Sequence, residues 1–284
     1  MSKTRIQQSL LILAGVGLVL FLYFFGDKKN RPVTAEKGPM QGSEMPNRTS
    51  TMSFDKLLEL AAGTLTKEQK DSVAFLQKLI DNSSETKKAK MIENLANLWA
   101  RTQNLIVSAH YFEEVAKRDS TKDKWKTAGD YYFVGLQNTG DTAAKLFAGQ
   151  RSFECYAVAS RFDTSDTKIK VLEAVSLIDG VGNVMGGVLL LKEVEKTDPD
   201  NELMNVTLGR LAIVSGQYTK AIPRLERLVK LYPTNTEAYF HLGGAYRATG
   251  KKNEAIKMFE KCKELEKSPS FQKQMDEYIN QIKN

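Results

Sequence analysis

The stretch Tyr239–Phe259 reads YFHLGGAYRATGKKNEAIKMF, and its pattern recurs along the chain at a fixed period. The residues that recur every 34 positions are a glycine (Gly182, Gly216 and Gly250), a proline (Pro199 and Pro233), a large apolar residue (Leu191, Leu225 and Phe259) and a small residue (Gly187, Ala221 and Ala255). Self-similarity at a period of this size is the sequence mark of a solenoid. The segment Lys168–Lys267 therefore predicts stacked copies of one structural unit.

Each unit is predicted to be a pair of amphipathic helices. In the quoted copy, Gly243 and Ala255 supply small side chains where the two helices meet, and Phe259 fills the space beside them. Gly250 is placed to end the first helix in a left-handed conformation. Pro233 lies where the second helix of the preceding unit stops. One such pair cannot cover its own apolar face, so neighbouring pairs must stack.

The order of these residues resembles the tetratricopeptide repeat (TPR), whose pattern is aromatic-x-x-Leu-Gly-x-x-Tyr followed by Ala-x-x-x-Phe. The matching residues are Tyr239, Leu242, Gly243, Tyr246, Ala255 and Phe259. The resemblance is strong in the last three repeats and looser in Lys88–Ser120 and Lys122–Phe162. The second of these is longer around Leu136–Thr142. The resemblance implies an all-α, TPR-type α-solenoid of about five helix-turn-helix repeats plus caps.

Capping helices are expected at both ends of the array. Residues 53–87 lack the repeat pattern but predict two N-terminal capping helices, the second opening with a capping box at Thr66 and Gln69. Its predicted buried face consists of Val73, Leu76, Leu79 and Ile80. The polar segment Phe271–Ile282 predicts a C-terminal capping helix. The solenoid with its C-terminal cap is assigned to residues 88–284.

The first 26 residues predict a short tail and a single transmembrane anchor. The 21 residues Ile6–Gly26 carry no charge, and as a helix they would span about 31 Å, enough for a bilayer core of about 30 Å. A cleaved signal peptide would need a small-x-small site after the apolar run, and Phe24-Phe25-Gly26-Asp27 offers none. We therefore expect an uncleaved anchor, followed by a flexible linker over residues 27–52. Flanking charges leave the orientation open, so the solenoid could lie on either side of a bacterial inner membrane.

Net charge argues against general nucleic-acid binding. The chain has a formal charge of +7. Residues 1–52 contain seven Lys/Arg and three Asp/Glu and supply +4, whereas the other 34 basic and 31 acidic residues leave only +3. A nucleic-acid-binding protein needs a concentrated basic face. The predicted solenoid is nearly neutral, so no nucleic-acid partner is expected.

No catalytic or metal-binding constellation stands out. His110 and His241 each lack a His or Cys neighbour at ligand spacing. The two cysteines, Cys155 and Cys262, fall in distant repeats, too far apart for a disulfide, and are expected in or near the core. We therefore predict a protein that is not an enzyme and needs no cofactor or metal.

The TPR resemblance implies that partners bind the concave surface lined by the first helix of each pair. The candidate partner-binding residues at the corresponding positions are Asn97, Arg101, Asp130, Arg210, His241 and Arg247. The clamp that holds chaperone tails in some TPR domains is absent, because Glu93 and Glu173 stand where that clamp has lysine and arginine. Arg210 and Arg247 instead predict that an acidic or carboxylate-bearing peptide docks on the C-terminal half.

The layout of anchor, linker and helical array resembles membrane-anchored bacterial TPR proteins. That resemblance implies a membrane-tethered adaptor that binds a protein or peptide in its groove and helps to assemble a membrane or envelope complex. An alternative stays open, in which the array self-associates or packs rigidly as a structural subunit of a larger membrane machine.

Overall fold

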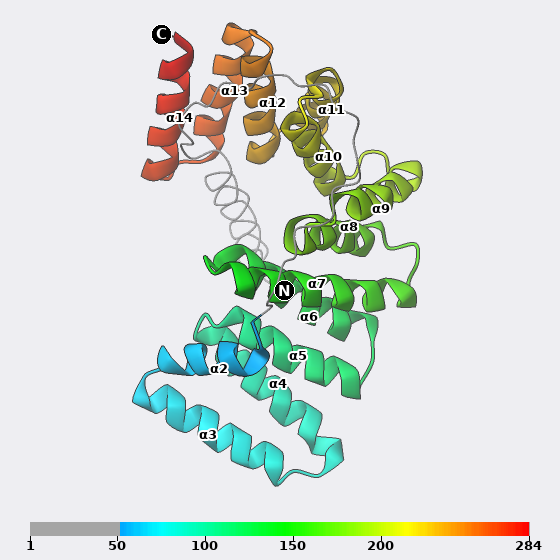
Figure 1. Cartoon of the computed structure of the whole chain (residues 1–284), viewed down its shortest axis with the longest axis vertical. Coiled ribbons are helices and arrows are strands. Elements are labelled where there is room, and N and C mark those ends of the chain that lie inside the picture. Colours follow the sequence, from blue (N-terminus) through cyan, green and yellow to red (C-terminus); the bar gives the residue numbers. More distant parts are fainter. Residues whose placement is uncertain (1–51, 284) are drawn as a thin grey trace, which may run out of the picture.

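The computed structural model describes residues 52–283, and every regular element among them is a helix. In chain order the helices are α2 (Phe54–Gly63), α3 (Lys67–Asp81), α4 (Glu85–Arg101), α5 (Leu105–Arg118), α6 (Lys122–Asn138), α7 (Thr142–Phe162), α8 (Thr167–Val175), the π-helix η1 (Ser176–Val181), α9 (Val184–Thr197), α10 (Glu202–Val214), α11 (Tyr218–Leu231), α12 (Thr236–Ala248), α13 (Lys252–Leu265) and α14 (Pro269–Lys283). Figure 1 shows them stacked in sequence order from α3 at one end to α14 at the other. The predicted all-α solenoid is confirmed.

Five helix pairs form the array, as the repeat pattern predicts. They are α4 with α5, α6 with α7, α8 and η1 with α9, α10 with α11, and α12 with α13. We call the first helix of each pair the A helix and the second the B helix. The A-helix face is the surface that the A helices α4, α6, α8 with η1, α10 and α12 present away from their B helices.

The recurring glycines end A helices in the predicted conformation. Gly182, Gly216 and Gly250 have φ values of 79°, 72° and 76°, in the left-handed region that costs glycine little. The same position in the first pair is filled by Gln103, whose φ is 63°. Among residues 52–283 it alone, apart from glycines, has a positive φ. The left-handed turn therefore also forms at Gln103, where the sequence has no glycine to indicate it.

Small residues bring the helices of a pair together. A Cβ atom at Gly243 would lie 2.9 Å from the Phe259 ring, and one at Gly187 would lie 2.3 Å from Ile178. Ala255 and Phe259 are buried. These contacts confirm the predicted roles of Gly243, Ala255 and Phe259 in joining α12 to α13.

The middle of the array departs from the regular pattern. In the longer repeat Lys122–Phe162, α7 has 21 residues, whereas the other B helices have 14, and the turn between α6 and α7 is Thr139–Asp141. The chain of the next A helix winds into a π-helix, η1, which the sequence did not indicate. Its Gly180 touches Gly149 of α7 so closely that a Cβ on Gly149 would lie 2.3 Å from the Gly180 Cα. No side chain separates the two backbones here.

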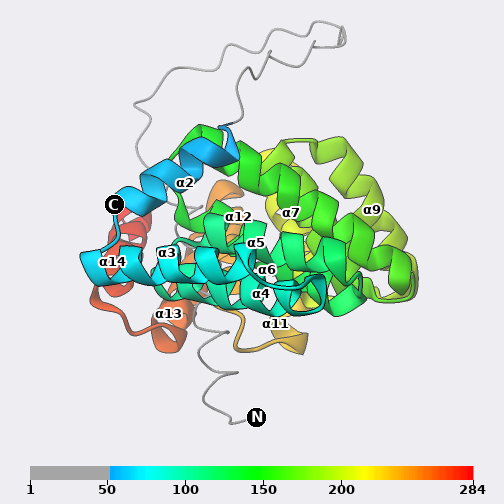
Figure 2. The ribbon, with the colours of Figure 1, turned by 90° about the horizontal axis from the view of Figure 1, so that it is seen from below.

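The N-terminal cap differs from its prediction at one residue. The capping box of α3 forms as expected between Thr66 and Gln69. Ile80 is buried, and Val73 and Leu76 are partly buried against α4. Leu79 was expected on this face, but it is 37% exposed, because α3 is the outermost helix and only one of its sides meets a neighbour (Figure 2).

The predicted anchor and most of the predicted linker lie outside the described residues. Within residues 52–283, none of the helices combines the length and the apolar character that crossing a membrane requires.

Candidate functional site on the A-helix face

A groove between α3 and α4 contains two of the candidate partner-binding residues. Its volume is about 720 Å³, and its lining residues are Asp71, Ser72, Phe75, Leu76, Asn94, Asn97, Leu98 and Arg101. The α3 wall contributes Phe75, whose side chain is 62% exposed. Asn97 and Arg101, predicted from the A-helix register, line the α4 wall. Phe75 and Asp71 were not predicted, because α3 lies outside the repeat.

Two polar side chains of this groove have hydrogen-bonding groups that could bind a partner. Asn97 Nδ2 donates to the Glu93 carbonyl oxygen at 2.8 Å, which leaves its amide oxygen able to accept. Arg101 is exposed, and its guanidinium makes no hydrogen bond or ion pair with any other residue in 52–283. A guanidinium fork suits a carboxylate, and an exposed aromatic ring suits an apolar side chain.

Asp130 is bonded to two neighbouring side chains. Its carboxylate accepts from Lys126 Nζ at 2.6 Å and from the Tyr156 hydroxyl at 2.8 Å. Burial, together with the charge and hydrogen bond of Asp130, raises the pKa of Tyr156 well above its usual value. The hydroxyl therefore stays protonated and donates to the carboxylate. Asp130 links α6 to α7 and has less capacity for a partner than the sequence indicated.

Arg210 is also held by a neighbour. Its Nη2 atom lies 2.9 Å from both carboxylate oxygens of Asp179 on η1. The two side chains are only 23% and 15% exposed. Burial raises the pKa of Asp179, although the adjacent Arg210 charge opposes the shift. Arg210 was predicted to bind the carboxylate of a peptide partner, but its carboxylate partner is Asp179 of the preceding A helix.

His241 lies beneath the surface rather than on it. The side chain is buried, and its Nε2 is 3.4 Å from Glu237 Oε1, one turn earlier on α12. Burial would raise the pKa of Glu237, but the hydrogen bond to His241 and the charges of His241 and Arg210 lower it. A partner could touch His241 only after displacing its neighbours.

Arg247 is exposed at the end of α12. Its guanidinium carbon lies 5.2 Å from the centre of the Tyr278 ring on α14, a cation–π contact. The contact ties the last A helix to the C-terminal cap while leaving the hydrogen-bond donors of Arg247 toward solvent.

The six candidate residues therefore do not form one continuous site. Asn97 and Arg101 share the α3–α4 groove, Asp130 and Arg210 are bonded to adjacent helices, His241 is buried, and the sixth, Arg247, stacks on the cap. The spacing between Glu237 and His241, four residues on one helix, could have revealed their contact. The pairing of Arg210 with Asp179 could not be found without the register between adjacent repeats.

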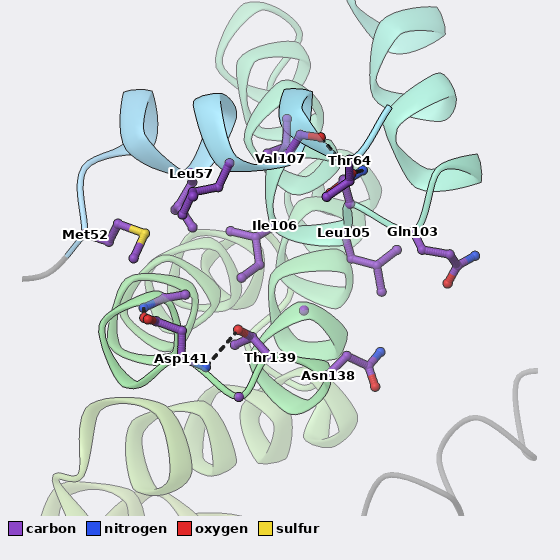
Figure 3. Close-up of a pocket in the computed structure, with 16 residues that line it drawn as sticks. Met52, Leu57, Thr64, Gln103, Leu105, Ile106, Val107, Asn138, Thr139 and Asp141 are labelled. Atoms are coloured by element: carbon purple, nitrogen blue, oxygen red, sulfur yellow. Dashed lines mark hydrogen bonds between the residues drawn. The ribbon is translucent and has the colours of Figure 1, made fainter. Parts of the chain in front are cut away.

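A second, smaller hollow of about 370 Å³ lies where α2 crosses the turns that precede α5 and α7 (Figure 3). Leu57 and Ile106 come from its facing sides. Asn104 Nδ2 donates to Thr64 Oγ1 at 3.4 Å across the α2 side. Asp141, the one acidic residue in the lining, caps α7 through the Ala144 amide at 2.8 Å. Its polar groups serve the turns, and they do not converge as a ligand site requires.

The described residues offer neither a metal cluster nor a reactive thiol. No three His, Cys, Asp or Glu side chains between residues 52 and 283 gather as a metal site would require. Cys155 and Cys262 are buried and unpaired, as expected. Burial raises the pKa of each thiol to about 12, so both stay protonated at neutral pH and are poor nucleophiles.

Comparison with known proteins addresses the fold. In structure, the chain resembles one from the hetero-tetramer Cut9–Hcn1 of APC/C, at a TM-score of 0.54 and 14% identity, over 80% of this chain and 41% of that one. The likeness shows the fold alone, a solenoid of paired helices.

Two other solved structures align with lower scores. One is a crystal structure of MamA, at a TM-score of 0.48 and 16% identity, covering 63% of this chain and 92% of that one. The other is YrrB, described as a TPR protein with an unusual peptide-binding site, at a TM-score of 0.44 and 14% identity, covering 70% and 95%.

By sequence, one family model matches residues 179–269 of the chain, that of the bacterial transcriptional activator domain. The matched stretch falls within the part where the 34-residue pattern is clearest and amounts to less than half of the chain. No curated protein matches the chain in sequence.

Proposed function

We propose that this protein is a non-enzymatic scaffold that binds a protein or peptide partner in the groove between α3 and α4. The observation that carries the proposal is that the free guanidinium of Arg101 and the exposed Phe75 ring line the same groove of about 720 Å³. Arginine and aromatic side chains are enriched where partners bind tightly. The TPR-like fold supports the same role, since a stacked array offers an extended surface for a partner.

The groove fits an extended segment that carries a carboxylate and a large apolar side chain. Arg101 would bind the carboxylate, and the amides of Asn94 and Asn97 would bond to the segment's backbone. Phe75 and Leu98 would contact the apolar side chain. The proposed ligand is still an acidic or carboxylate-bearing peptide, as the sequence predicts. Its proposed binding site is at the N-terminal end rather than in the C-terminal half, because Arg210 is already paired with the Asp179 carboxylate.

We further propose that the scaffold is tethered to a bacterial inner membrane. The uncharged run Ile6–Gly26 supports an anchor, and residues 27–52 supply a linker long enough to hold the solenoid away from the surface. In this arrangement the protein would help to assemble a membrane or envelope complex. Fractionation of cells tests the tether: the full chain should stay with membranes after a carbonate wash, and recovery in the soluble fraction would contradict it.

Substitution of Arg101 tests the binding site. Partners captured by the tagged full chain should be compared for wild type, Arg101→Glu and Arg247→Glu, the last as a matched exposed arginine on another A helix. Arg101→Glu should lose at least nine-tenths of each specific partner, whereas Arg247→Glu should retain it. Synthetic peptides with and without a free carboxylate then test the chemistry, since only the carboxylate form should distinguish wild type from Arg101→Glu. Equal capture by wild type and Arg101→Glu would refute the site.

A further inference from the structure

The two ends of the solenoid present different surfaces. At the C-terminal end, α14 buries Phe271, Met275, Ile279 and Ile282, and its outer side is polar. At the other end, α3 leaves Phe75 62% and Leu79 37% exposed. Terminal repeats of a soluble array need a polar outer face. Figures 1 and 2 show α3 at the end of the stack, so the exposed Phe75 and Leu79 lie on a terminal helix without a polar cap over them.

The exposed residues of α3 form a stripe with its own charge pattern. Asp71, Ser72, Phe75, Lys78 and Leu79 are all exposed and fall three or four residues apart, so they share one side of the helix. Within the described chain, neither Asp71 nor Lys78 takes part in an ion pair. The stripe thus combines an apolar centre with one unpaired charge of each sign.

The positions of these charges are self-complementary. Asp71 and Lys78 are equally distant in sequence from a point between Ala74 and Phe75, and they lie on the same flank of the stripe. If a second α3 runs antiparallel with its two-fold axis at that point, Asp71 of each copy faces Lys78 of the other. The two Phe75 rings meet at the axis, with Leu79 on the opposite flank. Such an isologous contact is the commonest way for soluble chains to pair.

We propose that the α3 stripe is a homodimer interface in which two copies of this chain pair through antiparallel α3 helices. The occupant is a second copy because the stripe satisfies its own charges, which a partner of unrelated sequence would match only by chance. A single helix pair lies at the small end of protein interfaces, so the dimer is expected to be weak and reversible. The contact would cover Asp71 and Phe75 on the outer margin of the α3–α4 groove, so pairing and the binding of a partner's apolar side chain to Phe75 exclude each other. The inference goes beyond the scaffold role proposed above.

Exchanging the charges of Asp71 and Lys78 between two copies tests the antiparallel pairing of α3. Two differently tagged copies of the full chain are co-produced, extracted in mild detergent, and captured through one tag while the other is quantified. Asp71→Lys places two lysines opposite each other, and Lys78→Asp places two aspartates opposite each other, so each variant should pair with itself at least tenfold less than wild type. A copy with Asp71→Lys and a copy with Lys78→Asp carry opposite charges at both contacts, so this mixed pair should recover the wild-type yield.

Matched controls separate this contact from folding and from partner binding. Lys273→Asp and Glu277→Lys alter exposed charges one turn apart on α14 and should leave pairing unchanged. Phe75→Asp should abolish pairing, and circular dichroism should show native helicity for every variant. Arg101→Glu should lose partner capture yet still pair, so failure of one proposal is distinguishable from failure of the other. The dimer is refuted if the single charge variants pair as wild type does, or if the mixed pair fails to form.

Discussion

The Nη2 atom of Arg210 on α10 lies 2.9 Å from both carboxylate oxygens of Asp179 on η1. The pair connects two successive A helices at the boundary where one hydrophobic cluster, centred on α5–α9, gives way to a second on α11–α14. An ion pair that is mostly removed from water must keep both partners, because a lone buried charge is costly. The pair therefore fixes the register of the C-terminal repeats on the middle of the array.

Removal of the Asp179 carboxylate should destabilise this junction. We expect Asp179→Ala to lower the free energy of unfolding by about 3 kcal/mol, since it leaves the Arg210 guanidinium buried without a partner. Urea unfolding followed by circular dichroism measures the loss. The double variant Asp179→Ala with Arg210→Met should recover part of it. A loss no greater in Asp179→Ala than in the double variant would show that the buried charge is not the cause.

The contact of Gly149 with Gly180 predicts a second sensitive point. A Cβ added at Gly149 would meet the Gly180 backbone at 2.3 Å, and backbone cannot move aside as a flexible side chain can. Gly149→Ala should therefore cost about 2–3 kcal/mol of unfolding free energy through overpacking. The control is Gly244→Ala within α12, where an added methyl has nothing within 4 Å. There the better helix propensity of alanine should stabilise by up to about 1 kcal/mol.

These positions show how far the sequence could predict the structure. The 34-residue period correctly placed Gly182, Gly216 and Gly250 and the helix pairs around them, because those features repeat within each unit. The partner of Arg210 could not be predicted, because Asp179 lies on a π-helix whose extra residue changes the direction of the side chains that follow. The exposure of Phe75 agrees with the predicted buried face of α3, which did not include it, whereas Leu79 was wrongly placed on that face. Periodicity identifies an apolar side of a capping helix, but it does not show how much of that side the neighbouring helix covers.

Arg101 and Asn97 are the two groove residues that could be predicted from the sequence. Their register on the A helix follows from the repeat, so both could be named from the sequence. The groove itself needs α3 as its second wall, and α3 lacks the repeat pattern. The repeat pattern therefore cannot predict which residues a capping helix contributes to the groove.

His110 predicts a pH dependence of stability. Its ring stacks on Phe54 with the ring centres 3.5 Å apart. Burial lowers the pKa of His110 from 6.5 to about 4; the charge of Glu114 opposes the shift, and the charges of Lys117 and Arg151 add to it. The unfolded chain binds a proton at this histidine below about pH 6.5, whereas the folded chain does so only near pH 4. Stability should therefore be independent of His110 above pH 6.5 and decrease as the pH falls from 6.5 toward 4.

A variant without the titrating ring isolates this contribution. His110→Phe preserves a stacked ring on Phe54, so the difference in unfolding free energy between wild type and variant should change by about 2 kcal/mol between pH 7 and pH 4. The expected change in unfolding free energy is smaller than the full linkage value because His110 keeps some contact with water. Urea titrations at four pH values measure it. Parallel pH profiles for the two proteins would contradict the prediction.

Gln103 offers the opposite kind of change, one that should strengthen the fold. Its φ of 63° lies in the left-handed region, which costs a residue with a Cβ about 1–2 kcal/mol. Gly216 and Gly250 occupy the equivalent turn without that cost. Gln103→Gly should raise the unfolding free energy by about 0.5–1 kcal/mol, because glycine removes the strain but has more freedom to lose from the unfolded chain.

The reverse change at an equivalent turn gives the comparison for Gln103→Gly. Gly250→Gln introduces the same side chain at a φ of 76° and should destabilise by a similar amount, since a Cβ there meets no neighbouring atom within 4 Å and only the backbone strain remains. Equal and opposite shifts in the urea midpoint would show that backbone conformation alone sets the preference. If Gln103→Gly destabilises, the Gln103 side chain must contribute a contact at the α4–α5 turn that outweighs the strain.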